Sequence, residues 1–298
     1  MRQPTRTTRS IAAIAGTIML SACSSFVVDS ESPPDRSEVS RYDDAKCKAT
    51  MTKSVYEDGV AWNACSREAA LVSYEYAQMA YNVYEKTTWF DLGPDIKPVE
   101  TPKETDKGFA YHVYERRRDG VLEEVIISYR GTNFEQWQDW IFGNIGLEQR
   151  AAALRVFDDV SARYGVLPSV TGHSLGGALA SQVSLCRNVR YNIVFDASPR
   201  FSKRFCGKLS YVNHNVSIVE YGEINKLLRI FGRESTQRYV SLNCLKKGGA
   251  VDQHSMRKLA ACLTNIASLE DDPAAIASRE RNKIPNDHEL LPQTMAQP

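Results

Sequence analysis

The sequence predicts an α/β fold with a mostly parallel central sheet flanked by helices, and three observations support this prediction. Short runs rich in β-branched and aromatic residues alternate with segments whose apolar side chains recur at helical spacing. One strand–turn–helix unit contains Gly-x-Ser-x-Gly at residues 172–176, a sharp turn that exposes its serine. Residues 46–268 have the apolar content of a single globular domain with a substantial core.

The first half of this domain is expected to contain a helix, a hairpin and a second helix. Apolar residues at helical spacing predict an amphipathic helix over 62–85. Segments 109–116 and 121–130 are rich in β-formers and flank Asp119-Gly120, a dipeptide typical of hairpin turns. A second apolar stripe predicts a helix over 147–164, closed by a glycine.

The second half is expected to supply most of the parallel strands. A short buried strand over 166–171 leads into the serine turn, and the small residues of 177–183 form the first turns of a helix. Further strands are predicted over 191–195 and 216–221. A final helix is predicted over 256–266, and the chain from 269 to 298 turns polar, as expected of a C-terminal tail.

The N-terminus has the pattern of an export signal. Three arginines precede an apolar run over residues 11–20, which is too short for a stable transmembrane anchor. The following Leu20-Ser21-Ala22-Cys23 resembles the lipobox of bacterial lipoproteins, which implies a signal peptide over 1–22 and acylation of Cys23. The residue after the cysteine is Ser24 and not Asp, which in Gram-negative lipoproteins goes with sorting to the outer membrane. The resemblance therefore implies a protein anchored in the outer membrane and facing the periplasm. The alternative is an ordinary secreted chain cleaved after Ala22.

Residues 23–45 are polar and contain two adjacent prolines, which is typical of a flexible tether. The whole chain has 37 basic and 36 acidic residues, and loss of three arginines with the signal peptide would change the formal net charge from +1 to −2. Such a near-neutral chain offers no electrostatic basis for binding nucleic acid. Attachment to a membrane would come from acyl chains.

Six cysteines remain after Cys23, and an even number in an exported chain predicts disulfides. Six cysteines allow 15 connectivities, of which neighbour pairing is the simplest. No Cys-x-x-Cys or His/Cys cluster has the spacing of a zinc site, so we expect neither a metal nor a cofactor. The neighbour pairs are Cys47–Cys65, Cys186–Cys206 and Cys244–Cys262.

Ser174, the central residue of the turn, is the candidate nucleophile. A serine hydroxyl needs a base to accept its proton, and on hydrolase scaffolds this histidine follows the serine in the chain. Of the five histidines, only His254 has both the right order and the right setting, a loop leading into the last helix. His173 lies inside the turn, with its side chain expected to point away from Ser174.

The acid that orients the histidine has two main candidates. Glu223 follows the strand over 216–221, between the serine and the histidine, where such a carboxylate is expected. Asp196 ends the preceding strand and is the alternative. Asp252 is a third option, but it is only two residues from His254. We take Glu223 as the first choice from chain order and strand-end placement.

An oxyanion hole needs two donors near the serine. One is the backbone N–H of Leu175, directly after the nucleophile. The second is expected after the strand that ends in Arg130, where Gly131 allows close approach and Thr132 offers both a backbone N–H and a hydroxyl. The alternative role of Thr132 is as a helix cap.

These residues together resemble the class 3, fungal-type lipase family of α/β-hydrolases. The resemblance spans about residues 109–265 and depends on Arg130-Gly131-Thr132, on the block 172–178, on the turn 197–200 and on His254. It implies the α/β-hydrolase fold, a Ser/acid/His mechanism and an oxyanion role for Thr132. The chain departs from the family in having a glutamate at the acid position and Asp196 where a glycine is common.

The sequence therefore predicts a membrane-anchored serine hydrolase that cleaves carboxylic esters of lipids through an acyl-enzyme. Its expected partners are an acyl-ester substrate and the membrane. Segment 133–146 is too short for a large apolar lid, so interfacial triglyceride lipase activity does not follow. Two alternatives remain open: a non-catalytic envelope protein that keeps the hydrolase shell, and an acyltransferase that uses the same triad.

Overall fold

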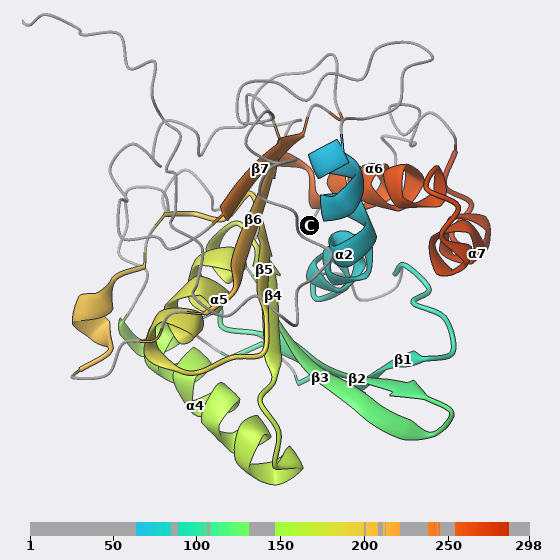
Figure 1. Cartoon of the computed structure of the whole chain (residues 1–298). Helices are drawn as coiled ribbons and strands as arrows, with labels where there is room; N and C mark the ends of the chain where they lie inside the picture. The colour runs from blue at the N-terminus through green and yellow to red at the C-terminus, as the bar shows by residue number, and fades with distance from the viewer. Residues whose placement is uncertain are drawn as a thin grey trace, which may run out of the picture.

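The computed structural model describes residues 64–84, 89–102, 104–105, 108–130, 147–199, 201–207, 211, 213–220, 238–242, 244 and 254–285. These residues form a seven-stranded sheet with helices on both faces (Figure 1). The strands are β1 (Ile96–Glu100), β2 (Tyr111–Arg118), β3 (Val121–Tyr129), β4 (Ser169–His173), β5 (Asn192–Phe195), β6 (Asn215–Glu220) and β7 (Arg238–Leu242). The helices are α2 (Ala64–Asn82), α4 (Leu147–Tyr164), α5 (Leu175–Cys186), the short η2 (Lys203–Phe205), α6 (Met256–Ser268) and α7 (Pro273–Arg281).

The sheet order follows the chain order, β1 to β7. The first two pairings are antiparallel, with the β2–β3 hairpin turning at Asp119 and Gly120, both at positive φ. The four pairings from β3 to β7 are parallel, with Tyr129 opposite Gly172 and His173 opposite Phe195. This arrangement confirms the predicted fold class, an α/β-hydrolase type with a mostly parallel central sheet.

The helices cover the two faces of the sheet unequally. Helices α4 and α5 connect β3, β4 and β5, three adjacent strands taken in one direction, so right-handed crossovers place both helices on the same face. Helices α2, α6 and α7 cover the opposite face (Figure 1). Each face has its own buried cluster, one with Met79, Ile126 and Leu263 and the other with Val125, Leu179 and Phe157.

Helix α5 is the central helix of the fold. All of its twelve residues are buried, because its small side chains allow β4, β5 and α4 to approach closely. The turn that leads into it is thereby held in a rigid setting.

The chain continues to pack beyond residue 268, where its polar composition led us to expect a tail. Helix α7 begins with Asp272, whose side chain accepts a hydrogen bond from the backbone N–H of Ala275, and Pro273 occupies the first turn. Gln78 of α2 donates to Ser278 of α7 at 2.9 Å. Ile284 is buried in the same cluster as α2 and α6. The globular part therefore reaches at least Ile284.

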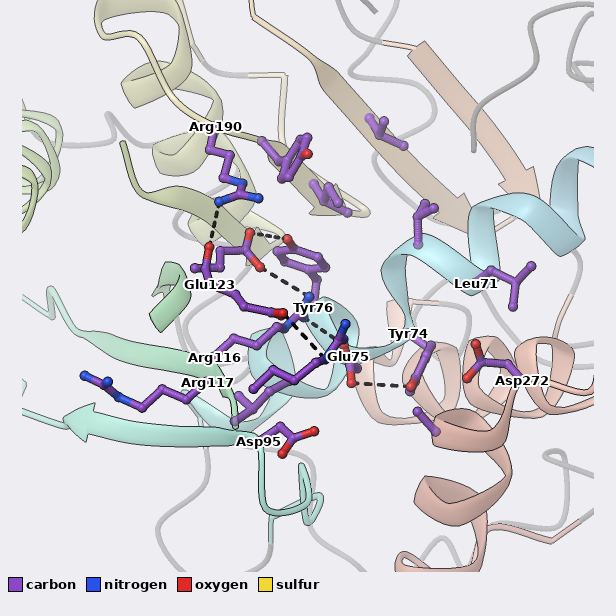
Figure 2. Close-up of a pocket in the computed structure, with 18 of the residues that line it drawn as sticks. Leu71, Tyr74, Glu75, Tyr76, Asp95, Arg116, Arg117, Glu123, Arg190 and Asp272 are labelled. Atoms are coloured by element: carbon purple, nitrogen blue, oxygen red, sulfur yellow. Dashed lines mark hydrogen bonds and ion pairs between the residues drawn. The ribbon is translucent and has the colours of Figure 1, made fainter. Parts of the chain in front are cut away.

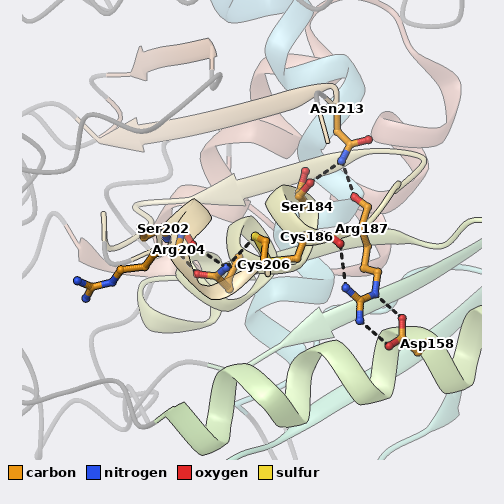
Figure 3. The surroundings of a disulfide bond; sticks show 9 residues. Asp158, Ser184, Cys186, Arg187, Ser202, Arg204, Cys206 and Asn213 are labelled. Atoms are coloured by element: carbon orange, nitrogen blue, oxygen red, sulfur yellow. Dashed lines mark hydrogen bonds and ion pairs between the residues drawn. A yellow bond between two sulfur atoms is a disulfide. The ribbon is translucent and has the colours of Figure 1, made fainter. Parts of the chain in front are cut away.

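Two of the predicted disulfides are confirmed. Cys186 at the end of α5 is bonded to Cys206 after η2 (Figure 3), and Cys244 after β7 is bonded to Cys262 in α6. Around the first bridge, Arg187 forms a two-pronged ion pair with Asp158 of α4 at 2.6 and 2.8 Å. The third predicted pair, Cys47–Cys65, lies outside the residues whose side chains are described.

Strands β1 and β7 and helix α7 were not predicted from the sequence. Strand β1 is largely exposed and contains Pro98, so it lacks the alternation that marks a half-buried strand. Within the described ranges, no helix is both long enough and apolar enough to cross a membrane.

Candidate active site

Ser174 lies in a strained turn between β4 and α5. Its backbone has φ 55° and ψ −120°, a region that residues with a side chain rarely occupy. The turn is fixed by hydrogen bonds: the Ser174 N–H donates to Phe195 O at 3.0 Å, and the Ser174 carbonyl accepts from the N–H groups of Ala178 and Ser198. This is the geometry of the predicted nucleophile turn, in which strain is maintained by the surrounding elements.

The glycines on either side of Ser174 are required by close approach. A Cβ at Gly172 would lie 2.5 Å from the backbone carbon of Gly176 and 2.8 Å from the carbonyl oxygen of Tyr129. A Cβ at Gly177 would lie 2.7 Å from the Cβ of Ala197. Real Cβ atoms do not approach other atoms so closely. The strand and helix can therefore meet at this angle only when both positions lack a side chain.

Three buried side chains meet beside this turn: His173, Asp196 and His254. One ring nitrogen from each histidine and one carboxylate oxygen of Asp196 all lie within 4.8 Å of one another. The rings of His173 and His254 have centroids 4.5 Å apart. The three residues come from the ends of β4 and β5 and from the residue before the α6 cap, so they share the carboxyl edge of the parallel strands with Ser174. Active sites of open α/β sheets lie at this edge.

Asp196 has the features of a positioned acid. Its side chain is fully buried, and its Oδ1 accepts a hydrogen bond from the backbone N–H of Glu220 at 2.9 Å. Its φ is 42°, a conformation in which glycine is easily accommodated and aspartate is tolerated. The structure thus places the sequence's second-choice acid next to His254.

His173 is a neighbour of His254 that the sequence did not identify. Burial lowers the pKa of His173 well below its usual value, and the nearby His254 lowers it further, while a hydrogen bond to the His254 backbone partly offsets both effects. The ring is therefore neutral at pH 7. Tyr84 supports it from α2's end, donating its hydroxyl to the His173 carbonyl at 3.2 Å. The contact joins the end of β4 to the residue before the α6 cap, two segments far apart in the chain, so no local sequence pattern signals it.

The predicted site residues thus divide into two groups. Ser174, Leu175 and His254 are described, and Leu175 begins α5 with its N–H in the first helical turn, where no partner inside the helix exists for it. Glu223, Thr132, Asp252 and Cys23 lie outside the described residues. Their predicted roles stay predictions.

A cavity of about 400 Å³ lies elsewhere on the molecule (Figure 2). Residues of α2, β2 and β3 line it, together with residues of β1, β5, β6 and α7 and with His214, which lies just before β6. Arg116 pairs there with Glu75 at 2.7 Å and with the buried Glu124 at 3.3 Å. Glu124 also accepts hydrogen bonds from Tyr76 and Ser169. Because Ser169 begins β4 and Ser174 follows its end, about 16 Å of strand separates this cavity from the nucleophile. The cavity is therefore separate from the turn at Ser174.

Comparison with known proteins gives one match at the level of a family. Residues 48–201, just over half of the chain, match the Tle-like phospholipase domain. No curated protein matches the sequence.

Several solved structures are similar to the chain. The Rhizomucor miehei lipase propeptide complex has 16% identity and a TM-score of 0.39, covering 53% of this chain and 63%, or less than two thirds, of that lipase. A deletion mutant of the same complex has 18% identity and a TM-score of 0.44, covering 73% and 85%. The M37 lipase has 14% identity and a TM-score of 0.30, covering 73% and 81%. The scores are low, and the family assignment rests on the match over residues 48–201.

Proposed function

Because the chain belongs to the Tle-like phospholipase domain family, we propose that it is a serine hydrolase that cleaves carboxylic esters of lipids, with phospholipids as its substrates. The observation that carries the proposal is the strained turn at Ser174, with His254 and Asp196 beside it at the carboxyl edge of the sheet. A nucleophile, a base and an acid in this setting are the parts that acyl transfer requires.

The proposed reaction has two halves. In the first, Ser174 Oγ attacks the ester carbonyl while His254 takes its proton, and the same proton then passes to the leaving alcohol. In the second, His254 takes a proton from the water that attacks the acyl-enzyme. It then passes this proton to Ser174 Oγ as the bond to the acyl group breaks and the fatty acid leaves. The N–H of Leu175 stabilises the oxyanion in both halves, together with the expected donor at Thr132.

We propose Asp196 as the acid that orients His254, in place of Glu223, our first choice from chain order. The short separation between the Asp196 carboxylate and the His254 ring supports this role. Burial of Asp196 also supports it, because a charge close to the ring acts more strongly when water is excluded. Glu223 remains the competing candidate.

The experiment that tests the function measures fatty acid released from vesicles of phosphatidylethanolamine and phosphatidylglycerol. Wild-type protein should release fatty acid, and Ser174→Ala should reduce the rate at least about a thousandfold, because no nucleophile remains. Ser161→Ala is the matched control, since Ser161 lies in α4 and its hydroxyl donates to the Val166 carbonyl at 3.0 Å.

The outcome also separates the alternatives. Equal rates for wild type and Ser174→Ala would refute the serine mechanism. Absence of release by the wild type, with acyl groups transferred to an added alcohol, would indicate an acyltransferase. A folded wild type with neither activity would support the non-catalytic envelope protein.

We further propose that Cys23 is acylated and that residues 23–45 tether the catalytic domain to the outer membrane. The lipobox-like sequence before Cys23 supports this anchor. Cys23→Ser should move the protein from the membrane fraction to the soluble periplasmic fraction or block its maturation. Wild-type fractionation and migration of this variant would contradict the proposal.

A further inference from the structure

The cluster beside Ser174 contains more ligating groups than ester hydrolysis needs. A serine mechanism requires one imidazole and one carboxylate, whereas this edge of the sheet holds a second buried imidazole, that of His173. Two imidazoles and one carboxylate are the protein ligands of many zinc sites. The side chain left unexplained by the hydrolase mechanism is therefore His173.

The Nε2 atom of His173 is buried and has no hydrogen-bond partner among the described residues. An imidazole nitrogen that makes no hydrogen bond can bind a metal ion through its lone pair. The ring of His173 also lies beside that of His254, with centroids 4.5 Å apart.

The geometry points to a binding site for a divalent transition metal, Zn²⁺ above all, formed by His173, Asp196 and His254. A tetrahedral ion with bonds of about 2.0–2.1 Å needs ligand atoms about 3.3 Å apart. The three atoms lie within 4.8 Å of one another, so side-chain movements of up to about 1.5 Å would complete the set. Three protein ligands leave a fourth position for water.

Metal binding at this site inhibits the hydrolase. The lone pair of His254 that should accept the Ser174 proton would be bonded to the metal, and Asp196 would be withdrawn from the ring. Inhibition rests on the proposed function, because it requires His254 as the base. Binding itself does not, so the two claims can be tested separately.

Binding is tested by calorimetric titration of Zn²⁺ into the metal-free Ser174→Ala protein, which is catalytically silent by design. We expect one ion per chain and at least a tenfold loss of affinity in the double variant Ser174→Ala/His173→Asn. Asparagine keeps a donor near the Nδ1 position but removes the Nε2 ligand. The matched control is His214→Asn in the same background, because His214 lines the cavity at the far edge of the sheet.

Inhibition is tested by measuring ester hydrolysis by the wild type and by the His173→Asn and His214→Asn variants, each with Zn²⁺ and with EDTA. The ratio of the two rates is compared within each variant, so a change in basal rate does not affect the test. We expect the wild type and His214→Asn to be inhibited by Zn²⁺ concentrations at least tenfold lower than the concentration that inhibits His173→Asn.

The site would be overturned if the His173→Asn and His214→Asn variants bound Zn²⁺ with equal affinity. It would also be overturned if the Ser174→Ala parent protein bound no Zn²⁺. If His173→Asn does not fold, Asp196→Asn in the Ser174→Ala background replaces it, with the same tenfold loss expected and an unchanged affinity contradicting the site. The two claims can also separate. If His173→Asn loses Zn²⁺ binding but the wild type hydrolyses no ester in EDTA, the proposed hydrolase is refuted and the metal site stands.

Discussion

At the residue scale, Asp196 illustrates what sequence alone can establish about the site. Chain order identifies Ser174 and His254, because the strained turn and the loop before the last helix are local features. The acid has no such local signature, since Asp196 and Glu223 both follow strands. Only the tertiary packing that places the end of β5 beside the residue before the α6 cap brings the Asp196 carboxylate to His254. The same packing reveals His173, which the sequence left without a role.

Exchange of each acid for its amide tests the assignment at this scale. Asp196→Asn should reduce kcat by about two to four orders of magnitude with little change in KM, because the amide can donate to the ring and favour the wrong tautomer. Glu223→Gln should stay within a few-fold of wild type. The comparison is made by steady-state hydrolysis of a soluble p-nitrophenyl ester. A reversed pattern would assign the role to Glu223.

A second prediction at this scale concerns His112 of β2. Burial, and then the charge of Arg130, lower the pKa of His112 to about 4. The unfolded chain therefore binds a proton at higher pH than the folded one, so stability is lost as pH falls from about 6.5 to 4. Between pH 7 and pH 5 this effect is on the order of 1–2 kcal/mol.

His112→Gln should make the free energy of unfolding less dependent on pH over this range. Urea unfolding of both proteins at pH 5 and pH 7 measures the difference. The ring also contacts the Tyr114 hydroxyl at 3.1 Å, so the variant loses some stability at both values. The prediction concerns the pH dependence alone, and an identical slope in the two proteins would contradict it.

At the scale of elements, the unit β4–turn–α5 was predicted from sequence, with the strand placed too early. The predicted buried strand was 166–171, whereas β4 is Ser169–His173, and Val166 and Leu167 are exposed. Strand β4, the turn and the small-residue helix are encoded by a continuous local pattern over residues 166–183. Strands β1 and β7 and helix α7 were missed, because their stability comes from neighbours distant in the chain. Helix α7, for example, owes its position to Gln78 and to the core beneath Ala275.

The close approach of α5 to the segment after β5 gives a prediction for this scale. Gly177→Ala should destabilise the protein by about 1–3 kcal/mol, because its new Cβ would overlap the Cβ of Ala197. Adding Ala197→Gly should recover part of that loss, since it removes the atom at 2.7 Å. Chemical denaturation of the two single variants and the double variant measures the coupling.

Gly172→Ala is the matched control for this pair. Its Cβ would meet only backbone atoms, so Ala197→Gly should give it no recovery. If the changes in the free energy of unfolding caused by Gly177→Ala and Ala197→Gly are additive, the predicted overlap of the two Cβ atoms is not the cause of the destabilisation.

At the scale of the whole molecule, each confirmed disulfide closes a loop that contains a residue of the site. Asp196 lies between Cys186 and Cys206, and His254 lies between Cys244 and Cys262. The bridges therefore restrain the two segments that carry the proposed acid and the proposed base. Neighbour pairing of cysteines predicted both bridges, but only the structure shows their relation to the site.

Removal of the second bridge tests this relation. The double variant Cys244→Ser/Cys262→Ser should lose about 3 kcal/mol of stability, as expected for a closed loop of 18 residues. It should also lose activity at temperatures below its unfolding transition, because the segment with His254 is released from β7. Thermal unfolding and ester hydrolysis are followed on the same samples. Activity that falls only together with unfolding would contradict the positional role.

The central claim is that Ser174 is an activated nucleophile, and covalent labelling tests it most directly. The protein is incubated with a fluorophosphonate, and the modified residue is located by mass spectrometry of its peptides. The account predicts one adduct per chain, on Ser174, with much slower labelling in His254→Ala because the base is absent. A folded protein that acquires no adduct, or that carries it on a residue other than Ser174, would contradict the account.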